Sequence, residues 1–130
     1  MVTHFDGWYR WVLDDDWQWL KAIAIHESQE DPNTPDGDGG LAVGILQEHP
    51  DFFSDFGAPH CGPQCRREVI CSLIAFRNFW FKYSMLALRD RVGIFNHGAN
   101  GWSLIQDRLH DEYVCKVEVI HARLVGRLAA

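Results

Sequence analysis

The chain contains no long apolar run. None of its 130 residues belong to a stretch that approaches the roughly 18 consecutive apolar residues of a membrane-spanning helix. Residues 1–6 also lack the charged region followed by an apolar region that marks a secretory signal peptide. We therefore expect no membrane span, and no signal peptide is visible.

Clustered basic residues and several widespread catalytic motifs are missing as well. The net charge is −6, and lysine and arginine form no cluster that could follow a phosphate backbone, so nucleic acid is not an expected partner. The chain has no His-Glu-x-x-His pair, no phosphate-binding loop and no nucleophile elbow. We expect a protein that works without a metal or an organic cofactor.

Cysteine is present but sparse, with Cys61, Cys65, Cys71 and Cys115. Their spacing leaves three states open: free thiols, disulfides such as Cys61–Cys65 or Cys71–Cys115, or a zinc site. Zinc is the least favoured because the ligand spacing is poor and no second closely spaced pair exists.

The hydrophobic pattern predicts one mostly helical domain over residues 1–130. A chain of this length, 47% hydrophobic, suits a single core, and we expect a monomer. Apolar periodicity predicts helices over residues 4–13, 17–28, 48–56, 66–90 and 102–128. Two Pro, three Asp and three Gly within residues 31–43 predict a small β-hairpin. The expected class is mostly α, in the α+β sense.

Glu27 stands out because its predicted helix places it on the apolar face. Leu20, Ile23 and Ala24 form the stripe at i, i+3 and i+4, and Glu27 follows at i+7. Loss of hydration disfavours the charged carboxylate, and the nearby carboxyl end of the helix acts in the same direction. The pattern predicts a raised pKa for Glu27, as general acid catalysis requires. The alternative is a glutamate that pairs with a basic residue at the helix edge.

Three motifs follow in an order that resembles a known group of enzymes. They are Glu27-Ser28 with Pro32 close behind, then Gly40-Leu-Ala-Val-Gly-Ile-Leu-Gln47, then Ile94-Phe-Asn-His-Gly98. Across residues 17–102, this order and spacing resemble the soluble lytic transglycosylase and goose-type lysozyme group of the lysozyme-like superfamily. The resemblance implies a lysozyme-like helical domain in which a hairpin flanks the active-site cleft.

The resemblance further implies cleavage of the β-1,4 bond between N-acetylmuramic acid and N-acetylglucosamine in bacterial peptidoglycan. Glu27 would be the acid and base, and Asp36 or Asp38 would supply a second carboxylate, with Asp36 slightly preferred. Turn chemistry is an equally good explanation for either aspartate alone. The other implied site residues, which would bind substrate or shape the cleft, are Ser28, Gln47, Phe95, Asn96 and His97.

Two departures bear on the type of reaction. Phe95 stands where the group usually has Tyr, so the hydroxyl contact to the catalytic acid is expected to be absent, which favours a hydrolase over a transglycosylase. His97 replaces the usual Ala, and it is either a cleft donor or a loop-surface histidine.

Other functions stay open beside the peptidoglycan muramidase. These are a lytic transglycosylase that forms 1,6-anhydro products, an enzyme acting on a chitin-like polymer, and a non-catalytic domain that binds wall glycan. A phage-type endolysin, released from the host cytoplasm at lysis or carried in a virion, would act on the cell wall without a signal peptide.

Overall fold

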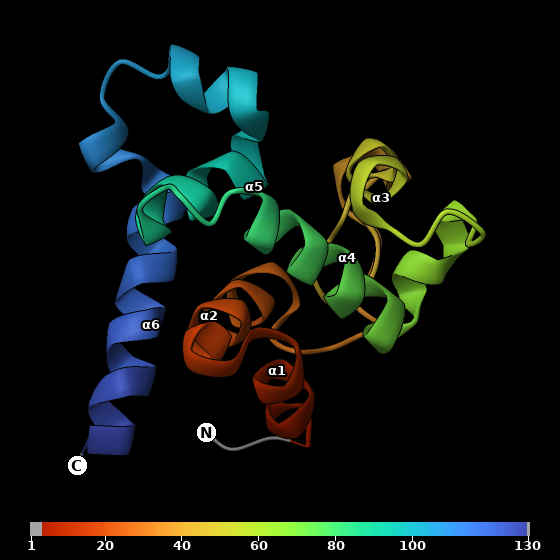
Figure 1. Cartoon of the computed structure of the whole chain (residues 1–130), viewed down its shortest axis with the longest axis horizontal. Helices are drawn as coiled ribbons and strands as arrows, with labels where there is room; N and C mark the ends of the chain where they lie inside the picture. Colours follow the sequence, from red (N-terminus) through yellow and green to blue (C-terminus); the bar gives the residue numbers. More distant parts are fainter. Residues whose placement is uncertain (1–3, 130) are drawn as a thin grey trace.

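The computed structural model describes residues 4–129, with side chains up to residue 126. Residues 1–3, which belong to the N-terminal segment in which no signal peptide is visible, lie outside this range. The described chain is mostly helical (Figure 1), as predicted. Its α-helices are α1 (Asp6–Leu13), α2 (Trp17–Ser28), α3 (Pro50–Phe56), α4 (Val69–Lys82), α5 (Leu88–Leu104) and α6 (Glu112–Ala129).

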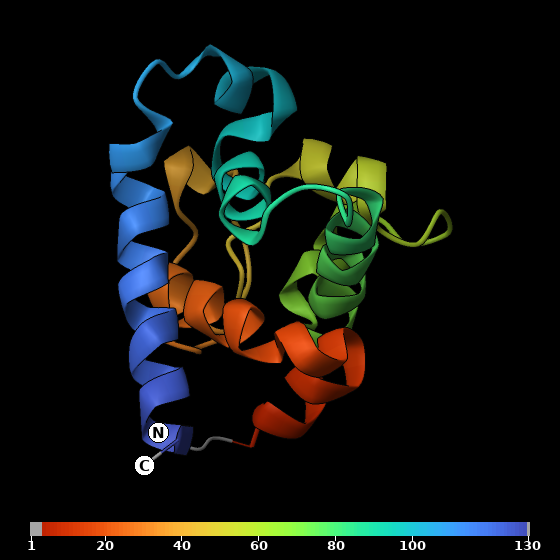
Figure 2. The ribbon, with the colours of Figure 1, turned by 60° about the vertical axis from the view of Figure 1, so that its left-hand side comes forward.

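Helix α2 lies at the centre of the fold. It contacts α1 and α6, and its Leu20, Ala22, Ile23 and Ala24 are fully buried. Helix α6 runs along one side of the molecule (Figure 2), where the ring of His121 stacks on Trp19 with centroids 3.8 Å apart. The predicted helix over residues 17–28 is confirmed, and Ile25, His26 and Glu27 in its final turn are partly buried.

The predicted β-hairpin is wrong. Residues 36–48 contain only two isolated antiparallel bridges, Gly37 with Ala42 and Val43 with Glu48, and no strand. The physical reason is the number of left-handed residues in this segment. Positive φ angles interrupt any extended run at Asp38, Gly39, Gly40, Gly44 and Gln47. The segment is a compact loop that follows α2, closed by a few cross-bridges.

The single helix predicted over residues 66–90 is also wrong. Helix α4 ends at Lys82, and α5 begins at Leu88 after a turn. Arg91 closes this turn by donating to the carbonyl oxygens of Ser84 and Leu86 at 2.8 and 3.1 Å. Met85, which the periodicity placed inward, is 95% exposed. After the break, α5 does not extend α4, and its Phe95 packs against Phe76 and Phe79 of α4.

The helix predicted over residues 102–128 begins ten residues later than expected. Trp102 belongs to α5, and α6 starts at Glu112, where the Asp111 carboxylate accepts from the backbone N–H of Val114 at 3.0 Å. A carboxylate in this place satisfies a helix N–H that otherwise has no partner. Val114, Val117 and Leu124 face inward as predicted, whereas Leu104 and Leu109 are exposed.

Arg66 fixes the 36–48 loop against the segment that precedes α4. Its guanidinium is buried and donates to the carbonyl oxygens of Leu41 and Glu48 at 2.6 and 2.7 Å. Gly44 allows this close approach, because a Cβ there would collide with the Arg66 carbonyl and its φ is +84°. One buried arginine therefore holds the middle and the end of the 36–48 loop.

We expect Arg66→Ala to destabilise the protein by about 3 kcal/mol, because it leaves buried carbonyl groups without a donor. Urea unfolding followed by circular dichroism measures this loss. Arg67→Ala is the matched control, since Arg67 is half exposed and bonds to the side chains of Gln64 and Asp36. Equal losses in the two variants would contradict the proposed role of Arg66.

The cysteines are free thiols in this structure. Cys115 lies beside the Leu109 carbonyl, with its Sγ 3.6 Å from that oxygen, so it forms no disulfide with Cys71. Burial is the main cause that raises the pKa of Cys71, to about 11, and Cys65 and Cys61 add to it. Within residues 4–129, no helix combines the length and apolar character needed to cross a bilayer.

Candidate active site

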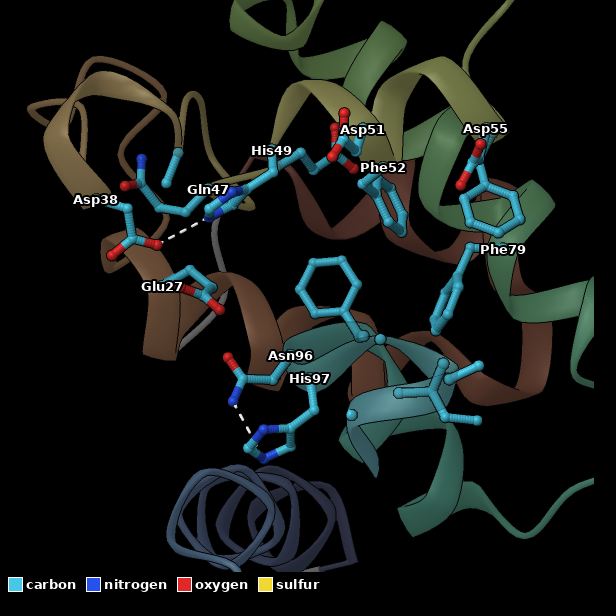
Figure 3. A pocket seen from close by; sticks show the side chains of 18 of the residues that line it. Glu27, Asp38, Gln47, His49, Asp51, Phe52, Asp55, Phe79, Asn96 and His97 are labelled. Atoms are coloured by element: carbon cyan, nitrogen blue, oxygen red, sulfur yellow. Dashed lines mark hydrogen bonds and ion pairs between the residues drawn. The ribbon is translucent and has the colours of Figure 1, made fainter. Parts of the chain in front are cut away.

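A cavity of about 640 Å³ lies between the end of α2, the 36–48 loop and helices α3, α4 and α5. Figure 3 shows Glu27 on one wall and the side chains of α3 on another. The volume falls within the range of about 300–1,000 Å³ that is usual for ligand pockets. None of the six tryptophans lines it, and the aromatic lining is Phe52, Phe56, Phe79, Tyr83 and Phe95.

Glu27 occupies the last turn of α2, on the cavity wall. The helix ends one residue later, and left-handed Gln29 and Glu30, with φ of 55° and 61°, turn the chain away. Burial raises the pKa of Glu27 to about 7, an increase that the Tyr113 hydrogen bond opposes and nearby Asp38 supports. The prediction of a raised pKa from the apolar-face position is confirmed, with burial as its main cause.

Tyr113 supplies the hydroxyl contact that the sequence analysis expected to be absent. From the first turn of α6, its hydroxyl donates to Glu27 Oε2 at 2.6 Å. Phe95 has no hydroxyl, and Tyr113 on α6 provides the contact in its place. The absence of a hydroxyl at Phe95 therefore no longer favours a hydrolase over a transglycosylase. The contact also fixes the carboxyl in one orientation toward the cavity.

Tyr113→Phe should raise the pKa of Glu27 above its value in the wild type. The hydroxyl stabilises the charged carboxylate, so its removal raises the pKa of Glu27 further. A hydrogen bond to a charged group contributes about 1.5–3 kcal/mol, and one pKa unit is about 1.4 kcal/mol, so we expect about one pH unit or more. A carbon-13 nuclear magnetic resonance titration of the Glu27 carboxyl between pH 5 and 9 measures the change, and an unchanged titration midpoint would contradict the assigned contact.

The two loop aspartates lie in different environments. Asp36 forms a two-point ion pair with Arg67, at 2.8 and 3.0 Å, and is not among the residues that line the cavity. That hydrogen bond lowers the pKa of Asp36. Asp38 does line the cavity, and its Oδ2 lies 2.8 Å from His49 Nε2. The structure therefore places Asp38 in the cavity lining and not the slightly preferred Asp36, because Arg67 holds Asp36 aside.

Ser28 and Gln47 serve mainly to build the loop. Ser28 is buried outside the cavity lining, and its Oγ donates to the Ile45 carbonyl at 2.6 Å. Gln47 does line the cavity, but its amide accepts from Gly37 N–H at 3.1 Å and donates to the Gly44 carbonyl at 3.0 Å. Ser28 therefore tethers the loop beside Glu27 and does not reach a ligand in the cavity.

The third motif lies on α5 and lines the opposite wall. The ring of Phe95 packs edge-on against Phe52 and Phe76, with centroids 5.2 and 5.1 Å apart. Asn96 and His97 are adjacent in the cavity lining (Figure 3), with Asn96 Nδ2 3.4 Å from His97 Nε2. Gly98, with φ +77° and ψ 161°, kinks α5 directly after them.

His97 is a cavity residue rather than a loop-surface histidine. Its Nε2 lies 2.9 Å from Asp111 Oδ1, and its ring stacks on Trp102 with centroids 5.8 Å apart. Asp111 thus caps α6 and holds His97, while Tyr113 two residues later holds Glu27. The first turn of α6 orients a side chain on each of two cavity walls.

Several lining residues were not predicted from the sequence. They are His49 at the start of α3, Asp51 and Asp55 on α3, and Lys82 at the end of α4. Tyr113, which bonds to Glu27 from outside the cavity lining, was not predicted either. The one available signal was the spacing of Asp51 and Asp55, four residues apart and hence on one helix face. Among the described residues, no group of three or more His, Cys, Asp or Glu side chains is placed to hold a metal ion.

Comparison of the chain with models of protein families, with curated proteins and with solved structures found no match. The residues and geometry of the cavity are therefore the basis for a functional proposal.

Proposed function

We propose that this protein is a glycosidase that cleaves the β-1,4 bond between N-acetylmuramic acid and N-acetylglucosamine in bacterial peptidoglycan. The observation that carries the proposal is Glu27, a partly buried carboxyl group on the wall of the cavity between the end of α2, the 36–48 loop and helices α3, α4 and α5. Burial raises its pKa to about 7, so much of it is protonated at neutral pH. That state is the one a glycosidase needs for its acid.

In the proposed reaction, Glu27 donates its proton to the glycosidic oxygen while the bond to the anomeric carbon breaks. Positive charge develops on the sugar ring, and the Asp38 carboxylate stabilises it electrostatically from the loop. The Tyr113 hydroxyl then stabilises the carboxylate that Glu27 becomes. Water completes the hydrolysis, leaving a new reducing end.

A lytic transglycosylase is the second candidate, and two contacts favour it. Arg67 holds Asp36 outside the cavity lining, so only one aspartate of the 36–48 loop, Asp38, remains beside Glu27. A site with fewer carboxylates to activate water suits a transglycosylase, which does not use water as the nucleophile. Tyr113 supplies Glu27 with the hydroxyl contact that Phe95 cannot. In this reaction the 6-hydroxyl of the muramic acid attacks in place of water, and Glu27 acts as both acid and base.

Loss of turbidity in a suspension of outer-membrane-permeabilised bacteria tests the proposal against a domain that only binds wall glycan. We expect the purified protein to clear the suspension within minutes and to release soluble wall fragments. Sedimentation of the protein with intact walls, with no release of fragments, would contradict the enzymatic assignment and support the binding domain.

A further inference from the structure

His49 lies beside Glu27 in a pair with Asp38. Its Nε2 is 2.8 Å from Asp38 Oδ2, and the two side chains are 44% and 69% exposed, so water reaches both. The pair sits on the loop side of the cavity, next to Glu27 (Figure 3). After burial and the Tyr113 hydrogen bond, Asp38 and His49 are the groups that act on the charge of Glu27.

The contact with Asp38 determines which nitrogen of His49 is free. A carboxylate only accepts hydrogen bonds, so Nε2 carries the proton and donates it to Oδ2. The lone pair is then on Nδ1, for which the described residues provide no hydrogen-bond donor. An imidazole held in this way by a carboxylate is fixed in one tautomer and one orientation, as a general base requires.

We propose that His49 is the general base that activates the attacking water, with Asp38 as its positioning residue, in an inverting hydrolase. This inference rests on the proposed function. Water loses a proton to His49 Nδ1 as its oxygen bonds to the anomeric carbon. Meanwhile, the glycosidic oxygen leaves with the bonding electrons and takes the proton of Glu27. His49 then releases its proton to solvent, and Glu27 regains one.

The second cavity histidine is a weaker candidate for this step. His97 is bonded to Asp111 and stacked on Trp102, on the α5 wall. It is not among the groups that act on the charge of Glu27, whereas His49 is. An inverting enzyme holds its acid and its base on either side of one glycosidic bond, with room for the attacking water between them. His49, whose charge acts on Glu27, fits this arrangement better than His97.

The test uses soluble, peptide-free peptidoglycan glycan strands and follows new reducing ends over time. We expect His49→Gln, which can still donate to Asp38, to lower the rate by about a hundredfold, the usual contribution of a general base. His49→Ala should be equally slow, and added imidazole should speed it up but not the wild type. His110→Gln is the matched control, because His110 forms a similar pair with exposed Asp107 outside the cavity.

The stereochemistry of the first product provides an independent readout. Attack by water opposite the leaving group makes the α-anomer first, which proton nuclear magnetic resonance detects before mutarotation. A β-anomer, or wild-type rates in His49→Gln, would overturn the assignment of His49 while leaving the glycosidase proposal intact. A wild-type protein that cleaves no strands would instead refute the glycosidase proposal itself.

Discussion

Glu27→Gln should abolish wall degradation, lowering the rate by at least about a thousandfold, because the amide has no proton to donate to the leaving oxygen. The amide is close in shape to the carboxylic acid and can still accept a hydrogen bond from Tyr113. The fold should therefore be retained. Turbidity assays and circular dichroism of the purified variant measure the two outcomes together.

The same variant should become more stable than the wild type as the pH rises. The pKa of Glu27 is about 7 in the folded state, above its ordinary value of 4.5. At pH values below the unfolded pKa, Glu27 is protonated in both the folded and the unfolded protein, so it does not lower the stability. Above the folded pKa it is charged in both states, and its burial then lowers the stability by the full amount. Removing the charge should thus change little near pH 4 and stabilise by on the order of 2 kcal/mol near pH 8.

Glu112→Gln is the control for this experiment, since Glu112 is exposed and pairs only with Lys116 one turn along α6. It should leave activity unchanged and should not stabilise the protein near pH 8, because Lys116 lowers the pKa of Glu112 whereas burial raises that of Glu27. Wild-type lysis by Glu27→Gln would remove the basis of the proposed mechanism. Equal stability of Glu27→Gln and wild type at pH 4 and pH 8 would contradict the raised pKa.

Asp38→Asn should cut turnover by about a hundredfold, which corresponds to on the order of 3 kcal/mol of barrier. The change removes the negative charge nearest the developing positive charge and weakens the hold on His49. The unfolding midpoint should move little, because Asp38 is an exposed loop residue. Kinetics at saturating substrate separate this loss of turnover from a loss of binding.

Asp36→Asn is the matched control, two residues away. Its ion pair with Arg67 lies outside the cavity lining, so the variant should retain nearly full activity. If Asp36→Asn were the slow variant and Asp38→Asn the active one, the assignment of the second carboxylate would be reversed. If both variants and the double variant kept full activity, Glu27 would work without a second carboxylate, and 1,6-anhydro products should appear.

The environment of Glu27 could be predicted because it follows from one helix. Positions i, i+3, i+4 and i+7 share a helix face whatever the rest of the chain does. The raised pKa follows from that local pattern, whereas α2 ends at Ser28, a few residues before the end near Asp31-Pro32 that the sequence indicates. The third motif was placed on the cavity wall by resemblance, and Phe95, Asn96 and His97 do line the cavity.

Features that depend on contacts between distant segments could not be predicted. Tyr113 reaches Glu27 across 86 residues of sequence, and nothing in the local pattern around Tyr113 indicates this. In the same way, Arg67 binds Asp36 across 31 residues of sequence and keeps it out of the cavity lining. The turn after Lys82 was missed because its apolar Met85 fits the helical period while the chain in fact turns into solvent there.

Mass spectrometry of purified peptidoglycan sacculi, digested with the wild type and with Glu27→Gln, tests the central claim most directly. The account predicts soluble disaccharide-peptides that end in reducing N-acetylmuramic acid from the wild type and none from the variant. Intact sacculi after wild-type digestion, or the same fragments from both proteins, would contradict the assignment of Glu27 as the acid of a peptidoglycan glycosidase.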